Sequence, residues 1–186
     1  MKRLFDLVTS IILFILLVIP MLLVAIAIRL TSKGQALYWS DRIGRGGVIF
    51  KMPKFRSMRV DAPAIATHLM EDPDQFLSPI GKFLRRSSLD ELPQLFSIIK
   101  GDMSFVGPRP ALFNQYDLIK LRIENGVDNL LPGVTGWAQI NGRDELSIPE
   151  KVALDVEYVN RQSFLFDMKV LWITLLKVVR KDGVSH

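Results

Sequence analysis

The sequence predicts a mainly α-helical α+β fold, in which one N-terminal helix enters a membrane and a compact domain with a small β-hairpin follows. Three observations support this fold class. Of the 186 residues, 49% are hydrophobic and 23% are charged, which is too apolar for an average soluble domain and too charged for a protein with many spans. One long uncharged run lies near the N-terminus, and helical spacing of apolar residues is prominent in the rest of the chain. We therefore expect a membrane element in residues 1–33 and a membrane-associated domain in residues 34–186.

The segment from Leu7 to Ile28 contains no charged residue. Its 22 residues would form a helix of ~33 Å, enough to cross the hydrocarbon core of a bilayer. Pro20 breaks this helix, because it removes a backbone hydrogen bond and its ring clashes with the preceding turn. Cations flank the segment on both sides, beginning with Lys2 and Arg3, so the positive-inside rule gives no single orientation. A re-entrant helix that bends at Pro20 and returns to the same membrane face satisfies both observations. An ordinary kinked spanning helix is the alternative.

The charge and the cysteine content restrict the chemistry. The chain has no cysteine, so it has neither a disulfide framework nor a thiolate zinc site, and function must depend on oxygen and nitrogen groups. The formal net charge is +5, and the segment from Arg29 to Arg59 contains eight cations against one anion, Asp41. Such a segment favours an anionic partner: lipid headgroups, a phosphorylated substrate or nucleic acid.

A β-hairpin is expected directly after the membrane element. The runs Ala36–Arg42 and Val48–Met52 are rich in residues that favour strands. Between them lie Gly44, Gly46 and Gly47, which can supply the positive φ angles of a turn. We expect this hairpin to lie just outside the bilayer.

The remaining segments are expected to be mainly helical. Asp61–Pro79 is rich in proline and acidic residues, which indicates a mobile surface loop with one short helix, and its histidine, His68, is expected to be solvated. Helices are predicted over Ile80–Lys100 and Ala111–Asn125, with the turn-rich passage Gly101–Pro110 between them. Phe164–Val179 is apolar but interrupted by charges, which suits an amphipathic helix lying in the membrane interface or, alternatively, a buried core helix.

The most informative short stretch surrounds Asp90 and Glu91. Ser88 and Glu91 have the spacing of a capping box, and Pro93 is tolerated only near the start of a helix. The two acidic residues are therefore predicted in the first helical turn, where the helix dipole would keep Asp90 ionised and favour phosphate. An ionised carboxylate can act as a nucleophile or as a magnesium ligand, and Glu91 could serve as a second ligand or as a base. The alternative is an acidic start of an ordinary surface helix.

Several cations are candidates for holding phosphate near this carboxylate pair. Lys54 and Arg56 lie in a compact basic run, and Arg85 precedes Asp90 by five residues. Arg109 lies between two prolines that fix its backbone, and Arg143 follows a glycine in a turn. Together with the carboxylate pair on a membrane-bound chain, these cations indicate an anionic diphosphate substrate near the bilayer.

Four stretches, in this order along the chain, resemble the bacterial sugar transferases, also called monotopic phosphoglycosyltransferases. The similarity covers nearly the whole chain, and it is closest to the short members that initiate bacterial protein N-glycosylation, because no block of spanning helices precedes Leu7. The four stretches are Lys54–Met58, Arg85–Leu95, Gly101–Pro110 and Pro132–Arg143.

The resemblance implies a monotopic enzyme of the bacterial inner membrane, with a re-entrant helix broken at Pro20 and its catalytic domain on the cytoplasmic face. It also implies a Mg²⁺-dependent transfer of a sugar-1-phosphate from a UDP-sugar to undecaprenyl phosphate, with release of UMP, as the first membrane step of glycoconjugate or polysaccharide assembly. By this analogy Asp90 attacks the β-phosphate and carries the phosphosugar, Glu91 is its partner acid or base, and Lys54, Arg56, Arg85, Arg109 and Arg143 hold phosphates. The expected partners are these substrates and membrane lipids rather than nucleic acid, and a homodimer is left open.

One position departs from the family pattern. Members often carry a serine before the helix-breaking proline, and its hydroxyl can cap a backbone carbonyl; here Ile19 occupies this position.

Two other interpretations of the sequence predict different behaviour. A membrane-anchored binding module would show no turnover and salt-sensitive binding, and a single-span enzyme of the same chemistry would place its N-terminus on the opposite side of the membrane.

Overall fold

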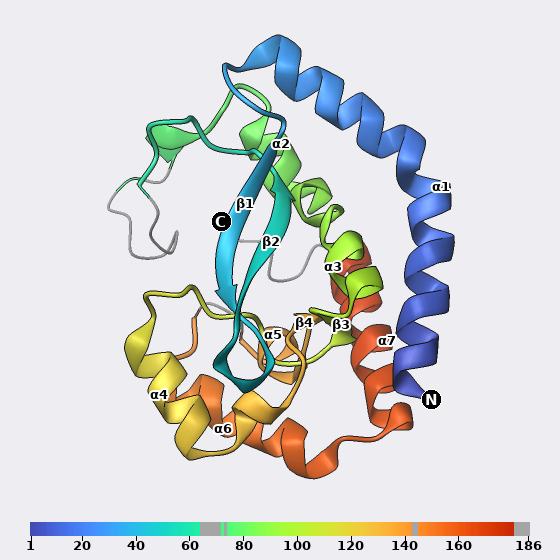
Figure 1. The fold of residues 1–186 in the computed structure, drawn as a ribbon, viewed down its shortest axis with the longest axis vertical. Helices are drawn as coiled ribbons and strands as arrows, with labels where there is room; N and C mark the ends of the chain where they lie inside the picture. The colour runs from blue at the N-terminus through green and yellow to red at the C-terminus, as the bar shows by residue number, and fades with distance from the viewer. Residues whose placement is uncertain (64–71, 73, 143–144, 181–186) are drawn as a thin grey trace.

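The computed structural model describes residues 1–63, 72, 74–142 and 145–180, so His68 and Arg143 lie outside the described residues. It has the predicted mainly helical architecture with a small antiparallel sheet (Figure 1). The helices are α1 (Lys2–Thr31), α2 (Gly81–Arg86), α3 (Gln94–Lys100), α4 (Tyr116–Glu124), α5 (Trp137–Ile140), α6 (Ile148–Arg161) and α7 (Phe164–Arg180). The strands are β1 (Leu37–Ile43), β2 (Ile49–Phe55), β3 (Ser104–Val106) and β4 (Gly133–Thr135), and 3₁₀ turns lie at Arg45–Gly47, Asp74–Phe76, Leu89–Glu91 and Val127–Asn129.

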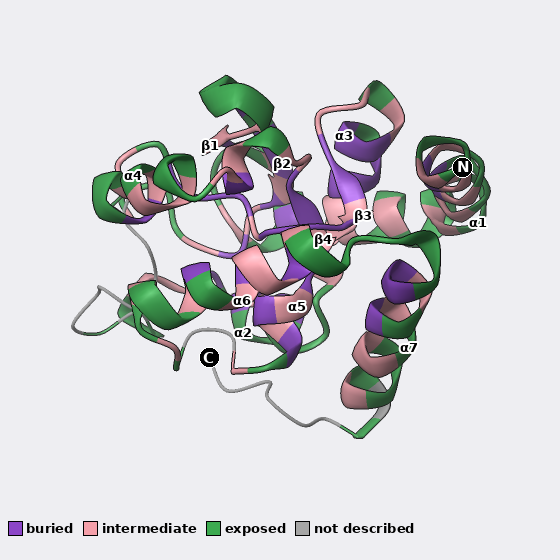
Figure 2. Ribbon diagram, turned by 90° about the horizontal axis from the view of Figure 1, so that it is seen from below, coloured by how far each residue is buried: buried purple, intermediate pink, exposed green. Residues whose placement is uncertain are grey.

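The long helix α1 arches along one side of the domain and changes direction about halfway along its length (Figure 1). Pro20 lies inside this helix, as expected for a bend. Within the described residues, α1 is the one helix long and apolar enough to cross a membrane, with a mean hydropathy of 3.4 over its most apolar window. Its inner face packs on α3 through Leu13, Phe14 and Leu17, whereas its outer face is exposed (Figure 2). The exposed apolar side chains of α1 include Leu4, Val8, Ile11, Ile12, Ile15, Leu16, Ile19, Leu22, Leu23, Ile26 and Leu30.

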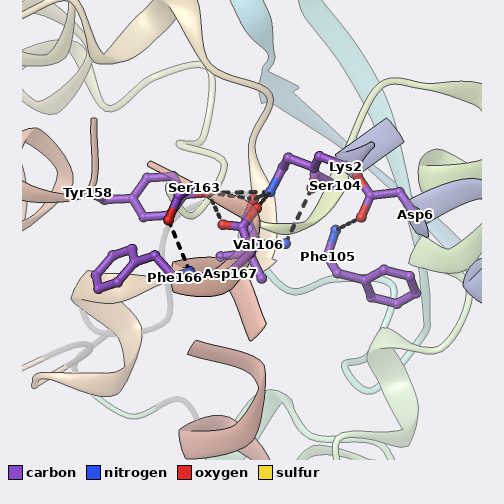
Figure 3. A network of polar contacts seen from close by, with 9 residues as sticks. All are labelled: Lys2, Asp6, Ser104, Phe105, Val106, Tyr158, Ser163, Phe166 and Asp167. Carbon is purple, nitrogen blue, oxygen red and sulfur yellow. Dashed lines mark hydrogen bonds and ion pairs between the residues drawn. The ribbon is translucent and has the colours of Figure 1, made fainter. Parts of the chain in front are cut away.

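A buried polar network fastens the N-terminal end of α1 to the domain (Figure 3). The Lys2 ammonium lies 2.6 Å from Oδ2 of Asp167 on α7 and donates a hydrogen bond of 2.9 Å to the carbonyl of Val106 on β3. The Tyr158 hydroxyl donates to the other oxygen of Asp167 at 2.6 Å, and burial raises the pKa of this tyrosine well above its usual range. The nearly fully buried Asp6 accepts the backbone N–H of Phe105 at 3.2 Å. These contacts join the start of α1 to α6, α7 and β3.

The C-terminal end of α1 also packs on the domain. Ile28 is fully buried and forms a hydrophobic cluster with Phe55 of β2 and Leu84 of α2. The helix then ends at Thr31, and Ser32 donates its N–H to the Ile28 carbonyl. Both ends of the apolar helix are therefore held by the same domain.

The hairpin formed by β1 and β2 confirms the sequence prediction. Its antiparallel register pairs Tyr38 with Lys54, Ser40 with Met52 and Arg42 with Phe50. Because directly paired residues share a face of a β-ribbon, Tyr38, Ser40, Arg42 and Lys54 lie on one face. At the tip, Gly46 and Gly47 have positive φ angles of 66° and 74°, whereas Gly44 does not.

The prediction of one helix over Ile80–Lys100 was wrong. The segment forms α2, a 3₁₀ turn over Leu89–Glu91 and then α3. The break is at Ser88, whose φ of 55° is left-handed and cannot continue a helix. Ser88 makes no capping bond from its side chain, so the predicted capping box is absent here; the capping box in the described part of the chain joins Ser147 and Glu150 at the start of α6.

The short strands β3 and β4 were not predicted and occupy the stretches expected to be turns. They pair in parallel, Ser104 with Gly133 and Val106 with Thr135. The pair continues into a very close backbone contact, because a Cβ atom on Gly107 would lie 2.3 Å from the Leu131 carbonyl oxygen. Only glycine permits this approach, which fixes the start of the Gly107–Pro110 segment.

The last two helical predictions hold with adjusted limits. The first, α4, begins at Tyr116, later than predicted. The second, α7, runs from Phe164 to Arg180 and is amphipathic. Phe166 and Val170 are buried against the core, while Trp172 and other large apolar residues are exposed (Figure 2). The helix is therefore not wholly buried, and its placement in the membrane interface stays a prediction.

Candidate active site

The sequence-predicted residues surround one cavity of about 370 Å³, a size typical of ligand sites. Its walls come from the hairpin, the Leu89–Glu91 turn, the Pro108–Pro110 segment and α4 to α6. Asp90, Glu91, Lys54, Arg56, Arg85 and Arg109 all line this cavity, although they are distant in sequence. The roles proposed for them stay predictions, and Arg143 lies outside the described residues.

Glu91 is held by two cations. Lys54 Nζ lies 2.7 Å from Oε1 of Glu91, and NH2 of Arg109 lies 3.3 Å from the same oxygen. The side chains of Lys54 and Glu91 are mostly buried, with exposed fractions of 16% and 18%. Burial lowers the pKa of Lys54, and the nearby Glu91 carboxylate raises it in part. This arrangement fixes Glu91 between the hairpin and the Pro108–Pro110 segment.

Asp90 differs from its neighbour because no hydrogen bond or ion pair within the described part of the chain occupies its carboxylate. The residue is buried, yet it lines the cavity. Lys54 lowers the pKa of Asp90 most among the cations, followed by Arg85, whose Nε donates to Ser57 Oγ at 3.1 Å. Within the described residues, the Asp90 carboxylate is therefore uncommitted, with Glu91 and several cations near it.

The expectation that a helix dipole keeps Asp90 ionised was wrong. Asp90 lies in a three-residue 3₁₀ turn rather than in the first turn of an α-helix, so no aligned helix dipole acts on it. Burial raises the pKa of Asp90 above its ordinary value, and Glu91 adds to this effect, while Lys54, Arg85 and Arg109 oppose it. Cations rather than a helix terminus are therefore what opposes the effect of burial on the pKa of this carboxylate.

Two arginines that line the cavity were not selected from the sequence. Arg42 donates to Ser40 Oγ at 2.9 Å and to the Pro110 carbonyl at 3.0 Å. Arg122 donates to the Arg109 carbonyl at 2.7 Å and pairs with the buried Asp155 at 2.7 Å. The sequence did indicate Arg42, because Ser40 and Arg42 alternate along β1 and therefore share one face of the strand. Only tertiary structure reveals Arg122.

Arg56 takes a different position from the other predicted cations. Its NH1 atom is buried and has no hydrogen-bond partner among the described residues. It lies so close to Gly34 that a Cβ on this glycine would be 2.1 Å away. The guanidinium therefore fills the space beneath the linker between α1 and β1 as it lines the cavity.

The donor set fits a hard divalent cation. Among the described residues no group of three or more acidic, histidine or cysteine side chains could hold a metal by itself. Mg²⁺ is commonly bound by one or two carboxylates together with substrate phosphates and water, and Asp90 with Glu91 beside it supplies carboxylates of this kind.

Comparison with known proteins identifies relatives over the whole chain. The family model described as bacterial sugar transferase matches residues 1–181. An uncharacterized sugar transferase, EpsL, of Bacillus subtilis is 38% identical over 189 residues, which cover 100% of this chain and 91% of that protein.

Two further relatives are longer and carry more specific names. The UDP-glucose:undecaprenyl-phosphate glucose-1-phosphate transferase of Escherichia coli is 37% identical over 95% of this chain and 40% of its own length. The undecaprenyl-phosphate galactose phosphotransferase of Salmonella typhimurium is 36% identical over 98% of this chain and 41% of its own length. This chain thus spans about two fifths of each of these two relatives.

Proposed function

Since the chain belongs to the bacterial sugar transferase family, we propose that it transfers a sugar-1-phosphate from a UDP-sugar to undecaprenyl phosphate. The names of the Escherichia coli and Salmonella relatives support this reaction class. The observation that carries the proposal is the contrast between the two adjacent carboxylates. Glu91 is engaged by Lys54 and Arg109, whereas the Asp90 carboxylate is uncommitted at the wall of a strongly basic cavity.

In the first step, a carboxylate oxygen of Asp90 attacks the β-phosphorus of the UDP-sugar. The bond between this phosphorus and the bridging oxygen breaks, UMP leaves, and Asp90 carries the phosphosugar. An anion can approach an anionic diphosphate only where positive charge offsets the repulsion, and Lys54, Arg85 and Arg109 supply this charge at the cavity.

In the second step, an oxygen of undecaprenyl phosphate attacks the same phosphorus. The bond to Asp90 breaks, which releases undecaprenyl-diphosphate-sugar and restores the carboxylate. Glu91 would act as the acid or base that gives a proton to, or takes one from, the incoming phosphate. It lies beside Asp90 and is fixed by two cations.

Asp90 and Glu91 are the residues that would hold Mg²⁺. When bound, the ion would neutralise diphosphate oxygens and so make the phosphorus more susceptible to attack.

The second substrate requires that the cavity lies near a bilayer. The exposed apolar outer face of α1 and the exposed apolar side chains of α7 support membrane association. Both ends of α1 contact the same domain, Lys2 through Asp167 and Ile28 through Phe55 and Leu84, which supports a re-entrant rather than a spanning helix. We propose that the domain lies on the cytoplasmic face of the inner membrane, where UDP-sugars are available.

The test is to incubate the detergent-solubilised protein with Mg²⁺ and a panel of UDP-sugars, without a lipid acceptor. Intact-protein mass spectrometry should detect an added sugar-phosphate mass, which digestion should map to Asp90. Addition of undecaprenyl phosphate should then remove the adduct and continue UMP release. Asp102→Asn is a matched control, because Asp102 pairs with Lys100 outside the cavity. An adduct on another residue would contradict the assignment of the nucleophile, and absence of UMP release with every donor would contradict the reaction.

A further inference from the structure

Within the described residues, not every positive charge around the cavity has an ion-pair partner. Lys54 and Arg109 share Glu91, and Arg122 is neutralised by Asp155. Arg42 lines the same cavity and forms no ion pair within the described part of the chain. Burial lowers the pKa of Arg42 to about 10, and the nearby cation Arg109 adds to this effect, while Glu91 and Tyr38 oppose it in part.

The Arg42 guanidinium is held rigidly on one side. Its Nε donates to the hydroxyl of Ser40, which is almost fully buried, and NH1 donates to the Pro110 carbonyl. The strand that carries it is fixed as well, since the N–H of Ile43 donates to the Ala111 carbonyl at 3.0 Å. The NH2 group has no hydrogen bond within the described residues. A planar guanidinium fixed through two of its nitrogens presents the third in a defined direction.

Arg42 and Arg122 both donate hydrogen bonds to the same backbone segment, but they differ in their ion pairing. They donate to consecutive carbonyls, those of Pro110 and Arg109, and so hold this segment from two sides. A purely structural arginine in a partly buried place is expected to have a carboxylate partner, because an unbalanced buried charge destabilises the fold. Arg122 has such a partner in Asp155, and Arg42 has none among the residues that the structure describes.

We propose that Arg42 is a further substrate-binding residue, which holds the diphosphate of the nucleotide-sugar together with Lys54 and Arg109. A diphosphate supplies the anionic oxygens with which the guanidinium is not paired in the described part of the chain, and a phosphate contact with NH2 leaves both fixing bonds intact. The hairpin face that carries Lys54 also carries Arg42, so the two strands deliver cations to one ligand. This inference rests on the proposed function, because it concerns the donor of that reaction.

The experiment measures binding rather than turnover. Isothermal titration calorimetry with UDP and with uridine, both in the presence of Mg²⁺, compares a ligand that has the diphosphate with one that lacks it. Arg42→Gln should weaken UDP binding by roughly tenfold to a hundredfold, the range expected when a charge-assisted hydrogen bond is lost, and should leave uridine binding unchanged. Arg42→Lys should fall between wild type and Arg42→Gln, because it keeps the charge without the planar fork.

Arg45→Gln is the matched control, since Arg45 is an exposed arginine at the tip of the same hairpin and lies outside the cavity. Its UDP affinity should equal that of the wild type. Equal UDP binding by wild type and Arg42→Gln would overturn the proposal, and so would equal losses for UDP and uridine, which would indicate a structural role. If Arg42→Gln does not fold, the same comparison on Arg42→Lys decides. The adduct experiment on the wild type distinguishes failure of the proposed reaction from failure of the Arg42 proposal. An adduct in the wild type, together with unchanged UDP binding by the Arg42 variants, would support the reaction and reject only the role of Arg42.

Discussion

The ionised Asp90 carboxylate is required for the proposed reaction, but its burial destabilises the folded protein. Burial raises its pKa above that in the unfolded chain, so the folded state disfavours the charged form. Its contribution to stability therefore falls as pH rises from the unfolded pKa through the folded one, and above this window the penalty is fully present. We predict that Asp90→Asn abolishes adduct formation and, at neutral pH, raises the thermal midpoint slightly in differential scanning calorimetry. Asp102→Asn should do neither. A clearly lowered midpoint for Asp90→Asn would show that the ionised carboxylate stabilises the fold.

A change at Lys54 tests which group lowers the pKa of Asp90. Lys54 is the largest of the influences that lower the pKa of Asp90, so its removal should raise this pKa further. We predict that Lys54→Met moves the acid limb of the pH profile of single-turnover adduct formation to higher pH, in addition to lowering the maximal rate by roughly tenfold or more. Lys51→Met, an exposed position on the same strand whose partner is Asp41, should leave the limb in place. An unshifted limb in Lys54→Met would assign it to another group.

At the scale of elements, the close contact between Gly107 and the strand that follows Leu131 positions Arg109. A methyl group on Gly107 would collide with backbone rather than with a flexible side chain. We predict that Gly107→Ala destabilises the protein by about 1–3 kcal/mol in a urea titration and lowers turnover by a larger factor, because Arg109 shifts. Gly126→Asn is the control: Gly126 has a positive φ, a Cβ there would lie 3.8 Å from the Asn129 side chain, an ordinary contact, and asparagine tolerates this conformation. Normal turnover in a destabilised Gly107→Ala protein would show that the segment adjusts without moving the arginine.

The anchor of α1 makes a second element-scale prediction. Lys2→Met leaves the buried Asp167 without its cation, although Tyr158 still donates to it. We expect the free energy of unfolding to fall by on the order of 3 kcal/mol, and the double variant Lys2→Met with Asp167→Asn to recover part of this loss. Unfolding in detergent, followed by near-UV circular dichroism, measures both. If the double variant were as unstable as the single one, the network would act through packing rather than through charge.

Much of this element scale could be predicted from the sequence, and the failures have physical causes. The hairpin, the apolar helix and α7 follow from local patterns that their tertiary setting reinforces. The prediction of one helix over Ile80–Lys100 was wrong because Ser88 adopts a left-handed conformation, which helix propensities do not predict. The strands β3 and β4 have three residues each and pair residues that are 29 positions apart, so neither shows a local pattern. Cations near Asp90 were predictable as a group, whereas the distinction between Arg42 and Arg122 depends on Asp155, which is distant in sequence.

For the whole molecule, the central question is how α1 lies in the bilayer. Because both of its ends pack on one domain, we predict that both are accessible from the cytoplasm. The chain has no native cysteine, so single cysteines inserted after Met1 or replacing Lys33 can be labelled without background. An impermeant thiol reagent should label neither in intact cells and both in inverted membrane vesicles. Labelling of the N-terminal cysteine from outside would establish a spanning helix.

The register of the hairpin links a remote position to the cavity. The tip residues Arg45–Gly47 do not touch the cavity, yet the turn that they form decides which residues of β1 stand opposite which residues of β2. A shift of one position would turn either Arg42 or Lys54 to the opposite face of the ribbon. If Arg42 and Lys54 hold one ligand, as proposed, that ligand constrains the length of a tip that it never contacts. Insertions that the turn absorbs should be tolerated, while those that slide one strand past the other should be eliminated, and the tip should vary among relatives in residue type more freely than in length.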